Sequence, residues 1–226
     1  MGFDWLSRPL EALDAWLEGL MHGAPPVAAL LVALVLGLRH ASDPDHLLAL
    51  TSLVSTGEGD VRAGVRLGAW WGAGHAATLV AVGTPLILAR AALPAGLERA
   101  AEVAIGVTIV VLAVRLLVTW PRRGRQPRAV PVGRLSWQAG GIGVLHGLGG
   151  TGAVALLLVA GLPGRGEALA ALWIFAAASL VSMAACSGAY AWLLTRRRLL
   201  PAAHTVVVPA VGVVGVLFGA WYAMAV

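Results

Sequence analysis

Apolar runs of about 20 residues constrain this chain more than any other feature, because a helix of that length spans a hydrocarbon core of about 30 Å. The chain has 226 residues, of which 59% are hydrophobic and only 12% are charged. A soluble domain carries about a quarter charged residues. The sequence therefore predicts an all-α integral membrane protein with little room for a soluble domain. Its single cysteine, Cys186, excludes an internal disulfide and a cysteine-based zinc site.

The apolar runs predict six membrane helices, and arginines concentrate in the loops after the first, third and fifth. These three loops share one side of the membrane, and the positive-inside rule places that side in the cytoplasm, with both termini outside. A basic cytoplasmic loop is expected at about 120–136. Because the arginines lie in such loops, the net charge of +5 does not indicate nucleic-acid binding. The expected spans cover about 25–55, 65–90, 99–119, 137–161, 167–195 and 203–225.

Residues 1–22 form a separate unit that precedes the six-helix domain, 23–226. Leucines recur there at three- and four-residue steps, which gives one apolar stripe on a helix, and acidic residues oppose it. The segment is too charged to span a membrane, so we expect an amphipathic helix in the outer interface. A secretory signal is excluded, because it would have a basic start and an uninterrupted apolar core.

Residues 37–46, Gly-Leu-Arg-His-Ala-Ser-Asp-Pro-Asp-His, place five ionisable side chains inside the first apolar run. Each costs about 2.5–3.5 kcal/mol at that depth. Pro44 has no N–H for the carbonyl of His40, so we expect the helix to kink or open there and free a backbone oxygen. Broken helices at the midplane bind ions in secondary transporters. The cluster predicts a metal or proton site; the alternative is a structural ion network in which Arg39 neutralises an aspartate.

Two further histidines lie near the middle of later spans. His75 adjoins a stripe of small residues that lets a neighbouring helix approach closely, and the first helix is the expected neighbour. His146 precedes glycines that weaken its helix. Gly37-x-x-His40 and Gly143-x-x-His146 begin alike, as a 3+3 inverted repeat would. His75 has an alternative interpretation as a packing residue.

These side chains offer imidazole nitrogens and carboxylate oxygens without a thiolate. Imidazole suits nickel, zinc, iron and copper, whereas carboxylates suit harder cations. The mixed set favours a divalent first-row ion such as Ni²⁺ or Co²⁺, bound as a transported substrate and not as a permanent cofactor. The candidate ligands are His40, Asp43, Asp45, His46, His75 and His146.

The cluster 37–46 resembles the His-x4-Asp-His signature of the nickel/cobalt transporter family (NiCoT). Residues 71–78, Trp-Gly-Ala-Gly-His-Ala-Ala-Thr, are similar to the second motif of that family. Residues 146–152, His-Gly-Leu-Gly-Gly-Thr-Gly, resemble a motif of its shorter nickel-permease-like branch, which is associated with urease and hydrogenase maturation. The resemblance implies metal recognition by His40, Asp45, His46 and His75, with Asp43 joining them.

The leading hypothesis is a secondary permease for Ni²⁺ or Co²⁺ in a bacterial plasma membrane. It would supply a urease, a hydrogenase or a cobalamin pathway, and it would not be an enzyme. An exporter or a metal sensor on the same site is the alternative, because its ligands would be identical. An intramembrane serine protease with Ser187 and His204 is a further alternative, although no Gly-x-Ser-x-Gly turn is present. The sequence does not indicate an oligomeric state.

Overall fold

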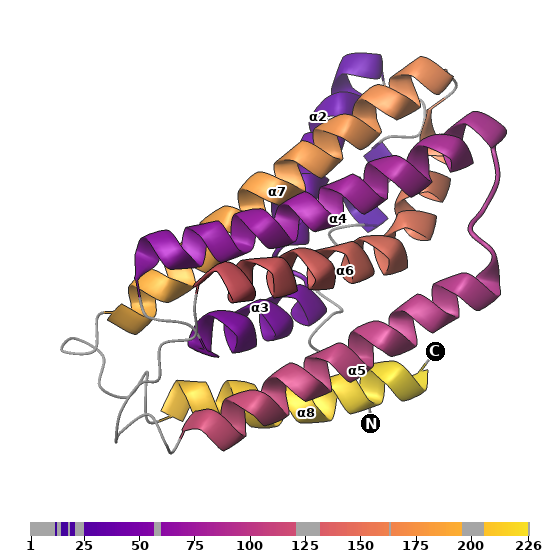
Figure 1. The fold of residues 1–226 in the computed structure, drawn as a ribbon. Helices are drawn as coiled ribbons and strands as arrows, with labels where there is room; N and C mark the ends of the chain where they lie inside the picture. Colours follow the sequence, from indigo (N-terminus) through magenta and orange to yellow (C-terminus); the bar gives the residue numbers. More distant parts are fainter. Residues whose placement is uncertain are drawn as a thin grey trace.

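A computed structural model describes residues 12, 15–17, 19–20, 25–56, 60–120, 132–162, 164–195 and 206–225. Among these residues the regular secondary structure is entirely helical, as the composition predicts. Figure 1 shows the arrangement of the helices. Their bounds are α2 Pro26–His40, α3 Pro44–Thr56, α4 Val61–Ala89, α5 Ala95–Thr119, α6 Val132–Gly161, α7 Arg165–Thr195 and α8 Val208–Ala225.

Several of these helices are long and apolar enough to cross a membrane. Among the described residues, α4, α5, α7 and α8 each meet that test, and α2 with α3 meets it as one span bent by 44°. The chain is therefore a multi-pass membrane protein with four or five candidate spans. Helices occupy all six expected ranges, and α6 begins at Val132, inside the expected loop. A crossing by α6, and with it the six-span count and the repeat, stays a prediction.

The first span is broken where Pro44 predicts a break. Proline begins α3, a position at which its missing N–H costs no helical hydrogen bond. Two turn hydrogen bonds connect the helices: Ser42 N donates to Arg39 O at 2.7 Å, and Asp43 N donates to His40 O at 3.2 Å. The expected kink is confirmed. The expected free carbonyl at His40 is wrong, because the Asp43 amide turns back to it.

The helices pack as two groups, which are joined by α3 and by the contact of α5 with α6. In the first group α4 lies against both α6 and α7, and α2 lies along α7; in the second, α5 pairs with α8 (Figure 1). The short helix α3 contacts α5, α8 and α7. One buried apolar cluster includes Leu53, Trp71 and Ile109 from α3, α4 and α5. A second cluster includes Leu36, Leu79 and Leu172 from α2, α4 and α7.

Glycines set how closely α4 approaches its two neighbours. A Cβ atom on Gly143 of α6 would collide with the Trp71 carbonyl oxygen, and one on Gly147 would lie 2.7 Å from the His75 carbonyl oxygen. On the other side of α4, a Cβ on Gly72 would lie 2.7 Å from the Leu180 Cα of α7. The small-residue stripe of α4 therefore packs on α7, and not on the first helix as expected from the sequence.

Most of the expected amphipathic segment, 1–22, lies outside the described residues. The six residues that are described there are helical. Leu17 is buried in the cluster with Leu36, whereas Trp16 and Leu20 are exposed. Of these three side chains, Leu17 packs on the protein and the other two do not. The interfacial position of the segment stays a prediction.

Candidate metal centre

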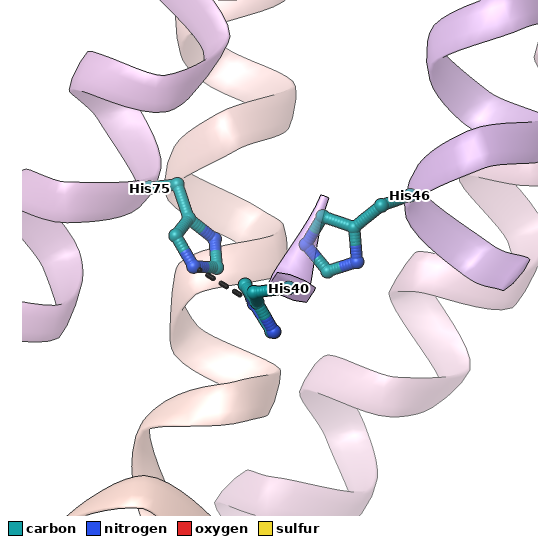
Figure 2. Close-up of side chains that lie close together, drawn as sticks. All are labelled: His40, His46 and His75. Atoms are coloured by element: carbon teal, nitrogen blue, oxygen red, sulfur yellow. Dashed lines mark hydrogen bonds between the residues drawn. The ribbon is translucent and has the colours of Figure 1, made fainter. Parts of the chain in front are cut away.

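Three histidines from three helices converge at the break in the first span. His40 ends α2, His46 lies in the first turn of α3, and His75 is central in α4. Figure 2 shows their rings turned toward one another, with the Nε2 atoms of His40 and His75 3.1 Å apart. One ring nitrogen from each of the three lies within 4.8 Å of the other two. His46 and His75 are buried, and His40 is partly buried.

The spacing of these nitrogens suits a transition metal ion. Two imidazole nitrogens bound to one metal at about 2.0–2.1 Å are about 3.0 Å apart at a right angle and about 3.4 Å apart at the tetrahedral angle. The His40–His75 separation of 3.1 Å falls between these values. The ligand nitrogens of all three histidines lie within 4.8 Å of one another, close to the spacing that one shared ion requires. The three side chains thus form a candidate metal site.

His146 of α6 extends this group. Its ring centroid lies 5.2 Å from that of His46 and 5.0 Å from that of Trp71. Its Nδ1 lies 3.1 Å from the carbonyl oxygen of Ile142, one turn earlier. A carbonyl oxygen only accepts, so Nδ1 carries the proton and Nε2 keeps its lone pair. That Nε2 is buried and has no hydrogen-bond partner among the described residues.

The two aspartates contact the opposite side of the imidazole rings. Asp43, in the turn between α2 and α3, places Oδ2 3.0 Å from His40 Nδ1 and Oδ1 2.8 Å from an Arg39 guanidinium nitrogen. Asp45 places Oδ1 3.0 Å from His46 Nδ1. All six candidate ligands therefore lie in one connected group.

Three neighbours of this group were not expected from the sequence. The ring of Phe175 lies 5.2 Å from that of His40, and the Trp71 ring lies 6.4 Å from that of His46. The Ser182 hydroxyl of α7 donates to the Leu38 carbonyl oxygen near the end of α2. Trp71 stands within the second motif, which could have drawn attention to it. Phe175 and Ser182 have no local signal, because only the packing of α2 on α7 brings them here.

The residues of the protease hypothesis give it no support. Ser187 is buried, and its hydroxyl donates to the Met183 carbonyl of its own helix at 2.7 Å. A Cβ on Gly68 of α4 would collide with that hydroxyl, so a neighbouring helix covers the serine. The proposed base, His204, lies outside the described residues.

Comparison with known proteins gives one informative relative. The chain is 23% identical over 172 residues to a protein named urease accessory protein UreH from Bacillus sp. (strain TB-90). The aligned region covers 70% of this chain and 73% of that protein. No family model and no solved structure matches the chain. The name of the relative describes an accessory protein and connects it to urease. The chain is thus similar to a protein named for urease, and its residues 37–46 resemble the His-x4-Asp-His signature of the nickel/cobalt transporter family.

Proposed function

We propose that the protein is a secondary permease for Ni²⁺ or Co²⁺. The observation that carries the proposal is the convergence of His40, His46 and His75, from three different helices, within 4.8 Å. Burying several ionisable side chains inside an apolar bundle is costly, and such residues usually mark an ion pathway. The relative is named for urease, and the nickel-permease-like branch that the motifs resemble is associated with urease maturation. This similarity favours nickel as the transported ion.

The position of the histidines along their helices supports transport over a purely structural role. His75 lies at the centre of Val61–Ala89, and His146 lies close to the centre of Val132–Gly161. The break after His40 likewise falls near the middle of the bent pair. Helices that cross a membrane place their centres near the midplane, where secondary transporters bind their substrates at broken helices. An ion held there is equally far from both aqueous sides.

The donor atoms favour some ions over others. Imidazole nitrogen binds Ni²⁺, Co²⁺, Zn²⁺ and Cu²⁺ well, whereas Mg²⁺, Mn²⁺ and Ca²⁺ prefer oxygen. We therefore expect Co²⁺ to compete with Ni²⁺ at equal concentration. A hundredfold excess of Mg²⁺ should leave nickel transport unchanged. The ion is a substrate in this proposal, and no resident cofactor is part of it.

Accumulation of radioactive nickel in cells tests the proposal. Cells that express the protein should accumulate more nickel than empty cells, and His46→Ala should abolish the difference. Thr108→Ala is a matched control, because the Thr108 hydroxyl donates to the Ala104 carbonyl of its own helix, α5. Undiminished accumulation by His46→Ala, at equal expression, would refute the proposal.

The direction of transport needs its own measurement, because the same ligands would serve an importer, an exporter or a sensor. An importer makes overexpressing cells more sensitive to added nickel. An exporter makes them more resistant, and a sensor changes neither nickel content nor growth. We propose import into a bacterial cytoplasm across the plasma membrane, through six spans with both termini outside.

The relative named for urease suggests what the imported metal serves. We propose that the protein supplies nickel to a metalloenzyme such as urease or a hydrogenase, or cobalt to a cobalamin pathway. Urease made in cells with this protein should reach full activity at a lower external nickel concentration than in cells without it. The same urease activity at every nickel concentration would contradict a supply role.

A further inference from the structure

We propose that the metal ion is bound by imidazole Nε2 atoms alone, and that Asp43, Asp45 and Arg39 are positioning residues that do not touch it. This inference rests on the proposed function, because it divides the roles within the same site. It departs from the ligand set that the residue types suggest, in which carboxylate oxygens bind beside imidazole nitrogens.

The first argument is that three of the four rings have Nδ1 close to an oxygen atom. His40 Nδ1 lies 3.0 Å from Asp43 Oδ2. His46 Nδ1 lies 3.0 Å from Asp45 Oδ1, an ion-pair distance without hydrogen-bond geometry. His146 Nδ1 lies 3.1 Å from the Ile142 carbonyl oxygen. Such partners fix the ring orientation and the proton position of metal-binding histidines, and they make the other nitrogen more basic.

The second argument is the placement of the Nε2 atoms. Those of His40 and His75 lie 3.1 Å apart. Those of His46 and His146 are buried and lack hydrogen-bond partners among the described residues, as do the Nδ1 atoms of His46 and His75. The ring centroids of His46 and His146 lie 5.2 Å apart. A buried polar atom without a partner is costly, so its presence in two neighbouring rings indicates a ligand between them.

The third argument is that Asp43 is engaged on both carboxylate oxygens. Arg39 contacts Oδ1 at 2.8 Å, and His40 contacts Oδ2 at 3.0 Å. Moving this carboxylate onto the ion would break a charge-assisted contact and release the His40 ring. Arg39 therefore acts through Asp43 on His40. With neutral imidazoles, Arg39, Asp43 and Asp45 together give the site one net negative charge, a modest attraction for a divalent ion that must also be released.

The experiment measures metal spectra and affinity of the purified full-length protein loaded with Co²⁺ or Ni²⁺. Asparagine keeps an acceptor oxygen for the imidazole N–H and is a poor ligand for these ions. Asp43→Asn and Asp45→Asn should leave the cobalt d–d bands and the imidazole scattering in nickel X-ray absorption unchanged. Their metal affinity should fall about 10–100-fold, the usual cost of losing an outer partner. Asp43→Leu, which removes the acceptor, should lose more affinity than Asp43→Asn.

His46→Ala provides the contrast, because it should remove one imidazole from the X-ray absorption spectrum and shift the cobalt bands. Shifted bands or a lost oxygen ligand in Asp43→Asn or Asp45→Asn would overturn the inference while leaving the proposed function intact. Absence of metal binding by the wild-type protein would overturn both. If one asparagine variant fails to fold, the other is assessed by the same spectra, because each carboxylate contacts a different histidine.

Discussion

The Nε2 atoms of His40 and His75 lie 3.1 Å apart, although the two residues are 35 positions apart in the sequence and lie on different helices. Two features of the fold create this contact. The break before Pro44 ends α2 at His40, and α7 holds α2 and α4 on adjacent parts of its surface. The histidine cluster therefore depends on helix packing as much as on the histidines themselves.

The first prediction concerns the crossing of α4 and α6. Gly143→Ala should reduce both thermal stability and nickel binding, because its Cβ would collide with the Trp71 carbonyl and push His146 away from His46. Overpacking of this kind costs about 1–3 kcal/mol. Gly141→Ala is the matched control on the same helix, since nothing lies within 4 Å of its Cβ. Equal melting temperatures for the two variants in detergent would contradict this account of the crossing.

A second prediction concerns the end of α2. The Ser42 amide, which would bond to the Leu38 carbonyl in a continuous helix, bonds instead to Arg39 O. The Ser182 hydroxyl supplies the replacement donor. Ser182→Ala should therefore destabilise the protein by about 1–3 kcal/mol, because the Leu38 carbonyl loses this donor, and should weaken nickel binding.

Ser179→Ala is the control for Ser182, because its buried hydroxyl bonds to the Phe175 carbonyl of its own helix. Thermal unfolding and nickel titration of the two variants in parallel provide the measurement. A Ser182→Ala protein that binds nickel as tightly as Ser179→Ala would show that this contact does not position His40.

A third prediction follows from the donor atoms. A metal binds only the unprotonated nitrogen of imidazole, so protons compete with the ion and metal affinity falls as the pH is lowered. Nickel titrations between pH 7.5 and pH 5 should show the weakest binding at the acid end. Affinity that rises on acidification would contradict a histidine site.

A fourth prediction tests the orientation in the membrane. Arg62 in the first turn of α4 and Ala92 beyond its opposite end are both exposed. The arginine distribution places Arg62 inside the cell. After Cys186→Ser removes the native thiol, Ala92→Cys should react with an impermeant maleimide in intact spheroplasts. Arg62→Cys should react only after permeabilisation. The reverse pattern would place the termini in the cytoplasm.

Local chemistry made much of the fold predictable from the sequence. Apolar length predicted helices at all six ranges, and the backbone chemistry of Pro44 predicted the break in the first span. The cost of burying charge identified the histidines that converge in the structure. Each of these features depends on residues that are close together in the sequence.

The rest depends on which helices become neighbours. The glycine stripe of α4 predicts that a neighbouring helix packs closely on it, but does not identify that helix. In the structure the neighbour is α7 and not the first helix. Ser182 and Phe175 are ordinary residues of an apolar helix until that packing brings them to the end of α2. Whether the His40 carbonyl has a hydrogen-bond donor depends on the turn between α2 and α3, in which the Asp43 amide donates to it. The sequence motif does not specify that turn.

The most direct test of the central claim is nickel uptake by purified protein in liposomes, with His75→Ala as the variant. His75 comes from α4, outside the first motif, so its requirement tests the assembled site and not only residues 37–46. The wild-type protein should move Ni²⁺ into the liposomes, and His75→Ala should reduce the rate at least tenfold while remaining folded. Uptake by His75→Ala at the wild-type rate would contradict a metal site shared by these helices.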